Sequence, residues 1–251
     1  MKYNVVITAG GTSEKIDNVR KITNSGTGKL GSIIAKNLIL THDEDIEKIY
    51  YICSNSSYKP TGNKIEIIQI DDTNSLEKAV QNILKTKKID YFIHSMAVSD
   101  YTVDYITTSE DLALEIDSSN LETSYVINNY KKGIKDNKIS SSKENLIIKL
   151  KKTPKIISNI KKLSPTTFLV GFKLLDKVEF SNLLNVAINL KDKNDLDIVV
   201  ANDLETIRHG KHEAFIIKKD NSYVRASGKD EIALKLIDEL FNTKKESYWF
   251  L

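Results

Sequence analysis

Residues 3–12, YNVVITAGGT, set a short apolar segment directly before a pair of glycines. We interpret Tyr3–Thr8 as a strand and Gly10-Gly11 as the turn that leaves it. In a doubly wound α/β sheet, ligands bind beyond the carboxyl ends of the strands. Glycines at such a place let the backbone approach a ligand and direct its N–H groups at it. A tight turn without a ligand would explain the two glycines almost as well.

Strand and helix patterns alternate along most of the remaining chain. Apolar residues at helical spacing predict a helix over residues 29–40, and Ser75 is placed to cap a second helix. Further runs predict strands over 49–53, 65–70, 89–93, 168–172 and 197–201, helices over 180–190 and 230–241, and a hairpin of 214–218 with 223–226. This alternation favours an α/β fold with a doubly wound, mostly parallel sheet covered by helices on both faces.

Residues 102–145 interrupt the alternation, because Ser, Asn, Asp and Lys separate only short apolar pieces there. A loop of this length is uncommon in a compact domain unless it has a function. It is either a disordered surface insertion or an inserted flap or dimerisation arm, and we favour the second. We therefore expect one domain over residues 1–251 that carries this insertion.

The composition excludes several classes of protein. The chain has 37 basic and 34 acidic side chains and a net charge of +3, and its lysines are scattered among acids, whereas a nucleic-acid-binding protein shows a concentrated basic patch. Its single cysteine, Cys53, allows no internal disulfide or cysteine metal cluster. No signal peptide pattern is visible, and no apolar run approaches the ~20 residues that span a bilayer. We expect a cytoplasmic protein that binds neither nucleic acid nor membranes.

A second glycine cluster, NSGTGKLG over residues 24–31, precedes the first predicted helix. Helix N-termini present unpaired N–H groups and receive phosphate readily. The spacing fails the P-loop pattern, since Leu30 follows Gly28-Lys29. Arg20 adds a planar guanidinium suited to phosphate or carboxylate. The two glycine turns with Arg20 and Asn24 between them suggest an anion-binding pocket.

Polar residues also follow later predicted strands. In HSMAVSDY, residues 94–101, Asp100 could contact a ligand amine or ribose, hold Mg²⁺ through water, or cap a turn. His94 is expected in the core or behind the ligand-contacting residues. In KTPKII, residues 152–157, Thr153 is a good cap and Pro154 suits a first helical turn. The segments Gly171-Phe172-Lys173 and Ala201-Asn202-Asp203 end two more strands. Each of these signals is weak alone.

Taken in order, six motifs resemble the phosphopantothenate–cysteine ligase family, in its free-standing bacterial form. They are ITAGGTSEKIDNVRKITNSGTGKLG, HSMAVSDY, NKISS, KKTPKII, VGFKLL and DIVVANDL, and the match runs from residue 3 to about residue 240. The resemblance implies a Rossmann-like fold, a homodimer, and a ligase of coenzyme A biosynthesis that joins phosphopantothenate to cysteine. It also implies CTP as co-substrate, with ATP possible, Mg²⁺ held mainly by the triphosphate, and no FMN.

The resemblance further assigns roles to matching positions. Asn24 holds the acyl intermediate, Lys138 assists the first half-reaction, and Arg20 lies in the same pocket. The substrate and intermediate set is Gly10, Gly11, Thr12, Gly28, Lys29 and Ala97. The nucleotide set is Met96, Ala97, Asp100, Lys138, Pro154, Lys155, Ile156, Ile157 and Phe172. The sequence departs from the family at Leu190 and Asn194, where bifunctional members have lysines that Lys191 or Lys193 could replace.

Two other functions stay open on the residues alone. An NAD(P)-dependent reductase could use the same fold, but it needs GxGxxG and an acidic residue about 20 positions later, which the glycine spacing does not supply. A nucleotide-binding regulatory module without turnover is the other alternative. Turnover of CTP that depends on phosphopantothenate distinguishes the ligase from both.

Overall fold

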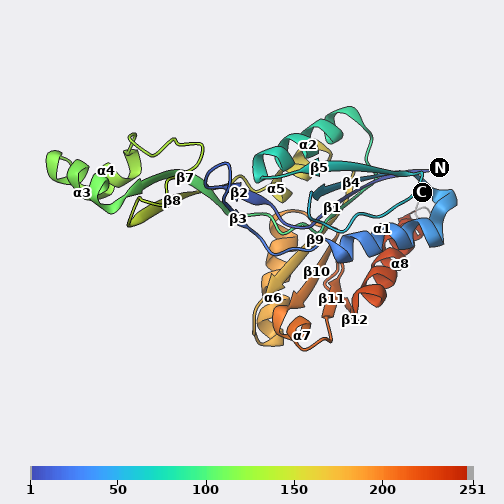
Figure 1. Cartoon of the computed structure of the whole chain (residues 1–251). Helices are drawn as coiled ribbons and strands as arrows, with labels where there is room; N and C mark the ends of the chain where they lie inside the picture. The colour runs from blue at the N-terminus through green and yellow to red at the C-terminus, as the bar shows by residue number, and fades with distance from the viewer. Residues whose placement is uncertain (1, 248–251) are drawn as a thin grey trace.

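The computed structural model describes residues 2–247, which form an α/β fold around one large sheet (Figure 1). Within this range the sheet has eight strands in the order β12-β11-β10-β9-β6-β1-β4-β5, parallel from β10 to β5 and antiparallel at β11 and β12. The strands are β1 (Tyr3–Ala9), β4 (Ile46–Ser54), β5 (Ile65–Ile70), β6 (Tyr91–His94), β9 (Phe168–Leu175), β10 (Ile198–Asp203), β11 (Glu213–Ile217) and β12 (Tyr223–Ser227). The predicted doubly wound, mostly parallel sheet is confirmed.

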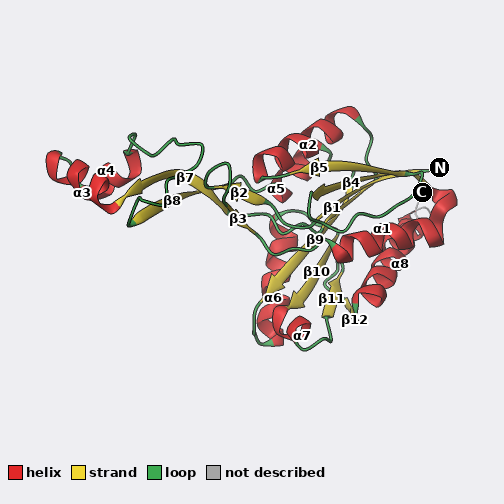
Figure 2. Ribbon diagram, in the orientation of Figure 1, coloured by secondary structure: helices red, strands yellow, loops and turns green. Residues whose placement is uncertain are grey.

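Helices cover both faces of this sheet, and the apolar face of each helix explains its side (Figure 2). On one face lie α1 (Lys29–His42) and α8 (Lys229–Ser247), which bury Ile34, Leu38, Ile232 and Leu236 in one cluster with alternate residues of β1 and β4. The other face holds α2 (Thr73–Thr86), α5 (Ile157–Leu163) and α6 (Phe180–Lys193). The remaining short helices are η1 (Asp43–Asp45) and α7 (Leu204–Arg208).

Two helix starts differ from the prediction. Asp72, not Ser75, is the N-cap of α2: its carboxylate accepts from the Ser75 backbone N at 2.8 Å, while the Ser75 hydroxyl accepts from the Asp72 backbone N at 3.0 Å. This reciprocal capping box satisfies donors on both residues. Thr153 and Pro154 do not begin α5, because the Thr153 backbone N donates to Asp100 O and the Thr153 hydroxyl donates to Ser99 O. Helix α5 begins three residues after Pro154, at Ile157.

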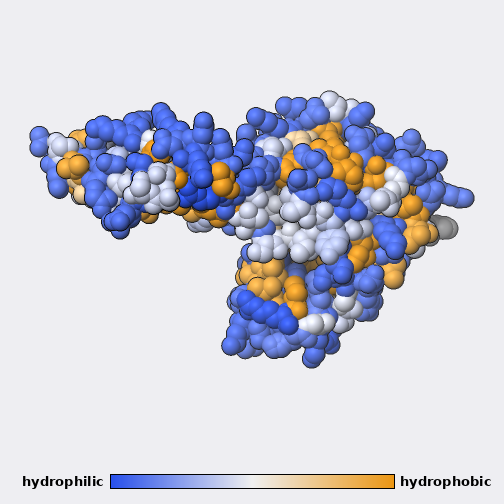
Figure 3. All heavy atoms as spheres, in the orientation of Figure 1, coloured by the Kyte–Doolittle hydropathy of each residue, from blue (hydrophilic) through white to orange (hydrophobic). Residues whose placement is uncertain are grey.

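The insertion forms an ordered arm that projects from the body of the molecule (Figure 1, left). Its stem is the antiparallel pair β7 (Tyr101–Thr108) and β8 (Leu146–Lys152), and α3 (Ser109–Ser118) and α4 (Thr123–Asn129) form its tip. The interpretation of residues 102–145 as a disordered insertion is therefore wrong. Leu146, Ile148 and Leu150 alternate along β8 and remain more than a third exposed, and Figure 3 shows hydrophobic atoms at the tip and along parts of the arm.

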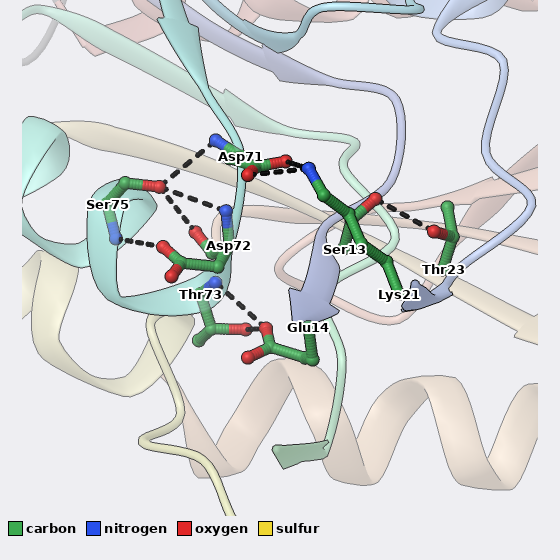
Figure 4. A network of polar contacts seen from close by, with 8 residues as sticks. All are labelled: Ser13, Glu14, Lys21, Thr23, Asp71, Asp72, Thr73 and Ser75. Atoms are coloured by element: carbon green, nitrogen blue, oxygen red, sulfur yellow. Dashed lines mark hydrogen bonds and ion pairs between the residues drawn. The ribbon is translucent and has the colours of Figure 1, made fainter. Parts of the chain in front are cut away.

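A small hairpin of β2 (Ser13–Lys15) and β3 (Lys21–Thr23) joins the first glycine turn to the second glycine cluster. Its outer side is fixed to the start of α2 (Figure 4). The buried Glu14 carboxylate accepts hydrogen bonds from the backbone N and the hydroxyl of Thr73, at 2.9 and 2.7 Å. The Lys21 ammonium pairs with Asp71 at 2.7 Å. These contacts hold the segment that carries Arg20 and Asn24 against the sheet.

Candidate functional site

The site begins where the strand order reverses. Strand β1 pairs with β4 on one side and with β6 on the other, all parallel, so a crevice opens beyond the carboxyl ends of β1 and β6. The glycine turn after β1 meets the segment after β6: Ala97 N donates to Gly10 O at 2.8 Å and Thr12 N donates to Ala97 O at 3.2 Å. The sequence placed both segments at strand ends, and the structure brings them into contact.

The backbone conformation and close packing of Gly10 explain why this turn needs glycine. Its φ is +92°, a left-handed conformation that side chains disfavour. A Cβ at this position would also lie 1.9 Å from the Ser57 hydroxyl oxygen. The close packing keeps the turn against the loop after β4 and leaves its other side open to the crevice.

A cavity of about 620 Å³ fills the crevice. Eleven of the predicted site residues line it: Gly10, Gly28, Lys29, Met96, Ala97, Asp100, Pro154, Lys155, Ile156, Ile157 and Phe172. Its wall also contains residues that the predicted site omitted, namely His94, Lys173, Asn202, His212 and Lys229. A volume of this size is within the range of small-molecule sites.

The charged side chains around the cavity favour an anion. Four lysines line it, Lys29, Lys155, Lys173 and Lys229, against the single carboxylate of Asp100. Lys155 pairs with Asp100 at the rim, where both side chains are mostly exposed. Among the described side chains of residues 2–242, Lys173 and Lys229 have no ion-pair partner. The unbalanced cations attract a ligand of opposite charge.

Asn24 lies at the edge of the cavity and not in its lining. Its Nδ2 donates to Ala97 O at 3.1 Å, and its backbone N donates to Thr12 O at 3.1 Å. Thr12 is fully buried, and its hydroxyl accepts from the Ser99 backbone N at 2.9 Å. Thr12 therefore stabilises the crevice wall without contacting a ligand. The half-buried Asn24 amide, in contrast, lies next to the carbonyl of Ala97, a residue that lines the cavity.

Arg20 and Lys138 lie together at the base of the arm. Arg20 Nη2 donates to Ile139 O at 2.6 Å and pairs with Asp17 at 3.1 Å, and Asn18 N donates to Asn137 O at 2.9 Å. Lys138 is exposed. Neither cation is among the residues that line the cavity.

Asp17, which the sequence did not single out, organises this second cluster. Its buried carboxylate accepts from the backbone N of Val19, Arg20 and Ile139 at 2.8, 2.7 and 3.1 Å. Burial alone would raise the pKa of Asp17, but these three donors and the Arg20 charge outweigh it and lower the pKa. Its partner Ile139 lies 122 positions away, so no local sequence signal could reveal the contact.

The two positions that depart from the family pattern also lie near the cavity. Leu190 lines it, and Asn194 is buried with its Nδ2 bonded to Leu190 O at 2.8 Å. Lys191 is buried elsewhere, because its ammonium donates to Lys219 O and to Asp192. Lys191 therefore does not supply a cation to the cavity, whereas Lys173 of β9 lines it.

His212 and the acidic residues bear on whether the site holds a metal. The His212 ring carries the one buried side-chain nitrogen without a partner among the described residues, and burial followed by the Lys229 charge lowers its pKa to about 4. Over the same residues, no group of three or more His, Cys, Asp or Glu could hold a metal ion.

A helix long and apolar enough to cross a membrane is likewise not found between residues 2 and 247.

Three comparisons relate the chain to known proteins. The family model described as "DNA/pantothenate metabolism flavoprotein C-terminal domain" matches residues 1–115 and 124–243. The coenzyme A biosynthesis bifunctional protein CoaBC of Thermococcus kodakarensis is 30% identical over 238 residues, which cover 94% of this chain and 50% of that protein. The chain thus spans about half the length of the curated relatives that it matches.

Solved structures agree on the fold. A DNA/pantothenate metabolism flavoprotein from Streptococcus pneumoniae superposes with a TM-score of 0.80 at 36% identity, covering 96% of this chain and 99% of that one. A mutant of Cab2 in complex with phosphopantothenate-cysteine gives a TM-score of 0.70 at 17% identity, covering 98% and 89%. At that identity the second similarity supports the fold alone.

Proposed function

Because this chain belongs to the family of the DNA/pantothenate metabolism flavoprotein C-terminal domain, as its motifs predicted, we propose that it is a phosphopantothenate–cysteine ligase of coenzyme A biosynthesis. One observation carries the proposal: the Asn24 amide rests on Ala97 at the point where the strand order reverses, beside a cavity lined by four lysines. An uncharged donor next to a cationic cavity suits a reaction between an acid, a triphosphate and an amine.

The reaction proceeds in two displacements. A carboxylate oxygen of phosphopantothenate attacks the α-phosphorus of CTP, pyrophosphate leaves, and an acyl-cytidylate forms. The cysteine amine then attacks the acyl carbon, CMP leaves with the carbon–oxygen bonding pair, and the amine loses a proton as the amide forms. The first displacement brings anions together, so nearby lysines lower its barrier by offsetting their repulsion.

Asn24 acts in the second displacement. An oxyanion develops on the acyl oxygen as the amine attacks, and an amide N–H is a suitable donor for it. The Asn24 Nδ2 has two hydrogens, one of which reaches Ala97 O at 3.1 Å. The other hydrogen is available for the acyl intermediate held against the Gly10-Gly11 turn.

Mg²⁺ enters as the metal complex of the triphosphate. The only carboxylate of the cavity wall, Asp100, is paired with Lys155, and the described part of the chain offers no cluster of acidic or histidine ligands. These residues do not fit a resident metal site. They fit a substrate whose own phosphate oxygens hold the ion, with the lysines neutralising the remaining charge.

A homodimer accounts for the position of Arg20 and Lys138. Both cations lie at the base of the arm and outside the cavity of their own chain, so they would act on the cavity of a second copy. The exposed Leu146, Ile148 and Leu150 of β8 supply apolar surface for such a contact. Size-exclusion chromatography with light scattering tests the oligomeric state, and a monomer at micromolar concentration rejects it.

Mixing inactive variants tests whether two chains share one site. If Asn24 and Lys138 of one site come from different chains, a heterodimer of Asn24→Ala and Lys138→Ala contains one intact site. Random exchange of the two impaired dimers should then raise turnover to about a quarter of the wild-type value. No recovery, with exchange verified by mass spectrometry of differently tagged chains, would place both residues on the same chain's site.

The decisive experiment is a coupled pyrophosphate assay. The purified chain is incubated with phosphopantothenate, Mg²⁺ and CTP or ATP, with and without cysteine, and the product is identified by mass spectrometry. Pyrophosphate release that requires phosphopantothenate, and phosphopantothenoyl-cysteine that requires cysteine, support the ligase. Nucleotide binding without turnover supports the regulatory module instead, and binding of NADPH supports the reductase.

A further inference from the structure

The last residue of β6, His94, occupies the centre of the crevice. It pairs in register with Thr8 of β1 on one side and with Gly171 of β9 on the other. The residue is only 8% exposed, yet it lines the cavity. A buried imidazole in the cavity wall, on β6 between β1 and β9, can contact a ligand directly.

Gly171 lets other side chains pack close beside this imidazole, since a Cβ on Gly171 would lie 2.6 Å from Leu196 Cδ1. Paired residues of a parallel sheet project to the same face, so the His94 ring and the missing Gly171 side chain share one side. A Cβ on Gly171 would lie 3.0 Å from Ile157 Cδ1, which shows that this side is the one covered by α5. The His94 ring therefore borders the corner of the cavity formed by the start of α5.

Thr8 determines which ring nitrogen carries the proton. Thr8 Oγ1 lies 2.8 Å from His94 Nδ1 and also accepts from the Met96 backbone N at 3.4 Å. Thr8 is fully buried, and His94 Nδ1 is the one acceptor its hydroxyl has among the described residues. The hydroxyl must then donate to Nδ1, which in a neutral ring places the proton on Nε2.

The ring stays neutral, and its second nitrogen faces the cavity. Burial lowers the pKa of His94 to about 4. Among the side chains described, those of residues 2–242, Nε2 has no hydrogen-bond partner, and it is not one of the inaccessible side-chain nitrogens without a partner. It is therefore accessible, and the accessible surface it has is the cavity that His94 lines.

The lining around this corner suits a nucleobase. Met96, Ile156 and Ile157 on this side are apolar, whereas the lysines without ion-pair partners, Lys173 and Lys229, suit the phosphates. Resting on the proposed function, we propose that the Nε2–H of His94, oriented by the Thr8 hydroxyl, donates a hydrogen bond to an acceptor atom of the bound nucleobase. His94 is then a positioning residue that contributes to the choice of nucleotide.

The proton position is testable without ligand or turnover. In the wild-type chain labelled with ¹⁵N-histidine, the ring shifts of His94 should report a neutral Nε2–H tautomer from pH 6 to pH 8. Thr8→Val removes the donor to Nδ1 and should convert the ring, wholly or in part, to the Nδ1–H tautomer, whereas Thr8→Ser should preserve Nε2–H. A wild-type ring that is charged, or protonated on Nδ1, overturns the inference.

Binding measurements test the ligand. Calorimetry of CTP, ATP and ribose 5-triphosphate compares the wild type with His94→Ala, His94→Gln and Thr8→Val. His94→Ala and Thr8→Val should weaken CTP binding about tenfold and leave ribose triphosphate unchanged, while the Gln amide, which keeps a donor, should restore most of the affinity. The double variant should be no weaker than His94→Ala. ATP shows whether adenine accepts the same hydrogen bond.

Two outcomes reject the nucleobase contact: unchanged CTP affinity in His94→Ala, or an equal loss for CTP and ribose triphosphate. Circular dichroism of each variant separates misfolding from lost binding. Because these assays read nucleotide binding, they remain informative if the chain forms no phosphopantothenoyl-cysteine. In that case the ligase proposal fails while the His94 contact is judged on its own result.

Discussion

Replacing Gly11 by alanine should disable the site with little loss of fold. An added Cβ would lie 2.0 Å from the Asn24 carbonyl oxygen and 2.9 Å from its carbonyl carbon. Ordinary contact requires about 3.4 Å or more, so the Asn24 backbone must retreat by roughly 1 Å. That backbone positions the amide that reaches Ala97 O at 3.1 Å. The substitution therefore displaces Asn24 without removing it.

The expected effect follows from this displacement. A misplacement of about 1 Å at a reacting group costs about 100-fold in rate, equivalent to about 2.7 kcal/mol of transition-state stabilisation. Overpacking should also destabilise the chain by about 1–3 kcal/mol. The assay is kcat/KM for phosphopantothenoyl-cysteine formation, with the melting temperature measured on the same samples.

Gly62→Ala provides the matched control. Gly62 is exposed, and a Cβ there would meet only the end of the Ile65 side chain, at 3.3 Å. This variant should keep wild-type kcat/KM within about twofold, because the Ile65 terminus can rotate away. A folded Gly11→Ala chain with kcat/KM within threefold of the wild type would refute the link between the glycine turn and Asn24.

Three further changes test other parts of the site. Asn24→Ala should lower amide formation by about 10²–10³-fold while the first-turnover release of pyrophosphate continues; normal product formation would remove Asn24 from the mechanism. Lys138→Ala should slow pyrophosphate release in the absence of cysteine by about tenfold or more, and an unchanged single-turnover burst would reject this function. Asp17→Asn tests how acid changes the stability of the cluster at the base of the arm. Since the folded-state pKa of Asp17 is lowered, its stabilisation is present above the unfolded pKa of about 3.9 and is lost as pH falls through the folded value. The melting temperature of Asp17→Asn, measured from pH 7 to pH 2, should therefore fall less with acid than that of the wild type; parallel curves would contradict this.

The sheet was predictable because its strands are apolar runs buried on both faces. Val5 to Ala9 and Ile49 to Cys53 are nearly inaccessible, and such runs identify parallel strands without any knowledge of their neighbours. The order of the strands is harder to predict from the sequence. The glycine turn after the first strand nevertheless indicates the edge of the sheet where ligands bind. The eleven predicted site residues that line the cavity came mainly from the family resemblance of the motifs, which strand ends alone would not have given.

The two small hairpins outside the main sheet were not predictable by these means, although the main helices were. Strands β2 and β3 have three residues each, too few for any periodicity to appear. The β7–β8 stem contains a bulge between Val103 and Tyr105, which breaks the alternation of a regular hairpin. Contacts such as Arg20 to Ile139 join residues 119 positions apart. The sequence alone could thus assign Arg20 to an anion pocket but could not place it at the base of the arm.

The long first motif, ITAGGTSEKIDNVRKITNSGTGKLG, contains one hairpin whose residues have different functions. Glu14 fixes it to α2, and Asp17 fixes its turn to the segment before β8. Both carboxylates are buried and hydrogen-bonded within the chain, so neither is available to a ligand. A residue that can contact a ligand nevertheless lies within four positions of each. Asn24 follows the same hairpin and contacts the cavity wall with its side chain, through Ala97. Substituting Glu14 or Asp17 should consequently impair catalysis by moving Asn24, with stability and turnover falling together, whereas substituting Asn24 should separate the two.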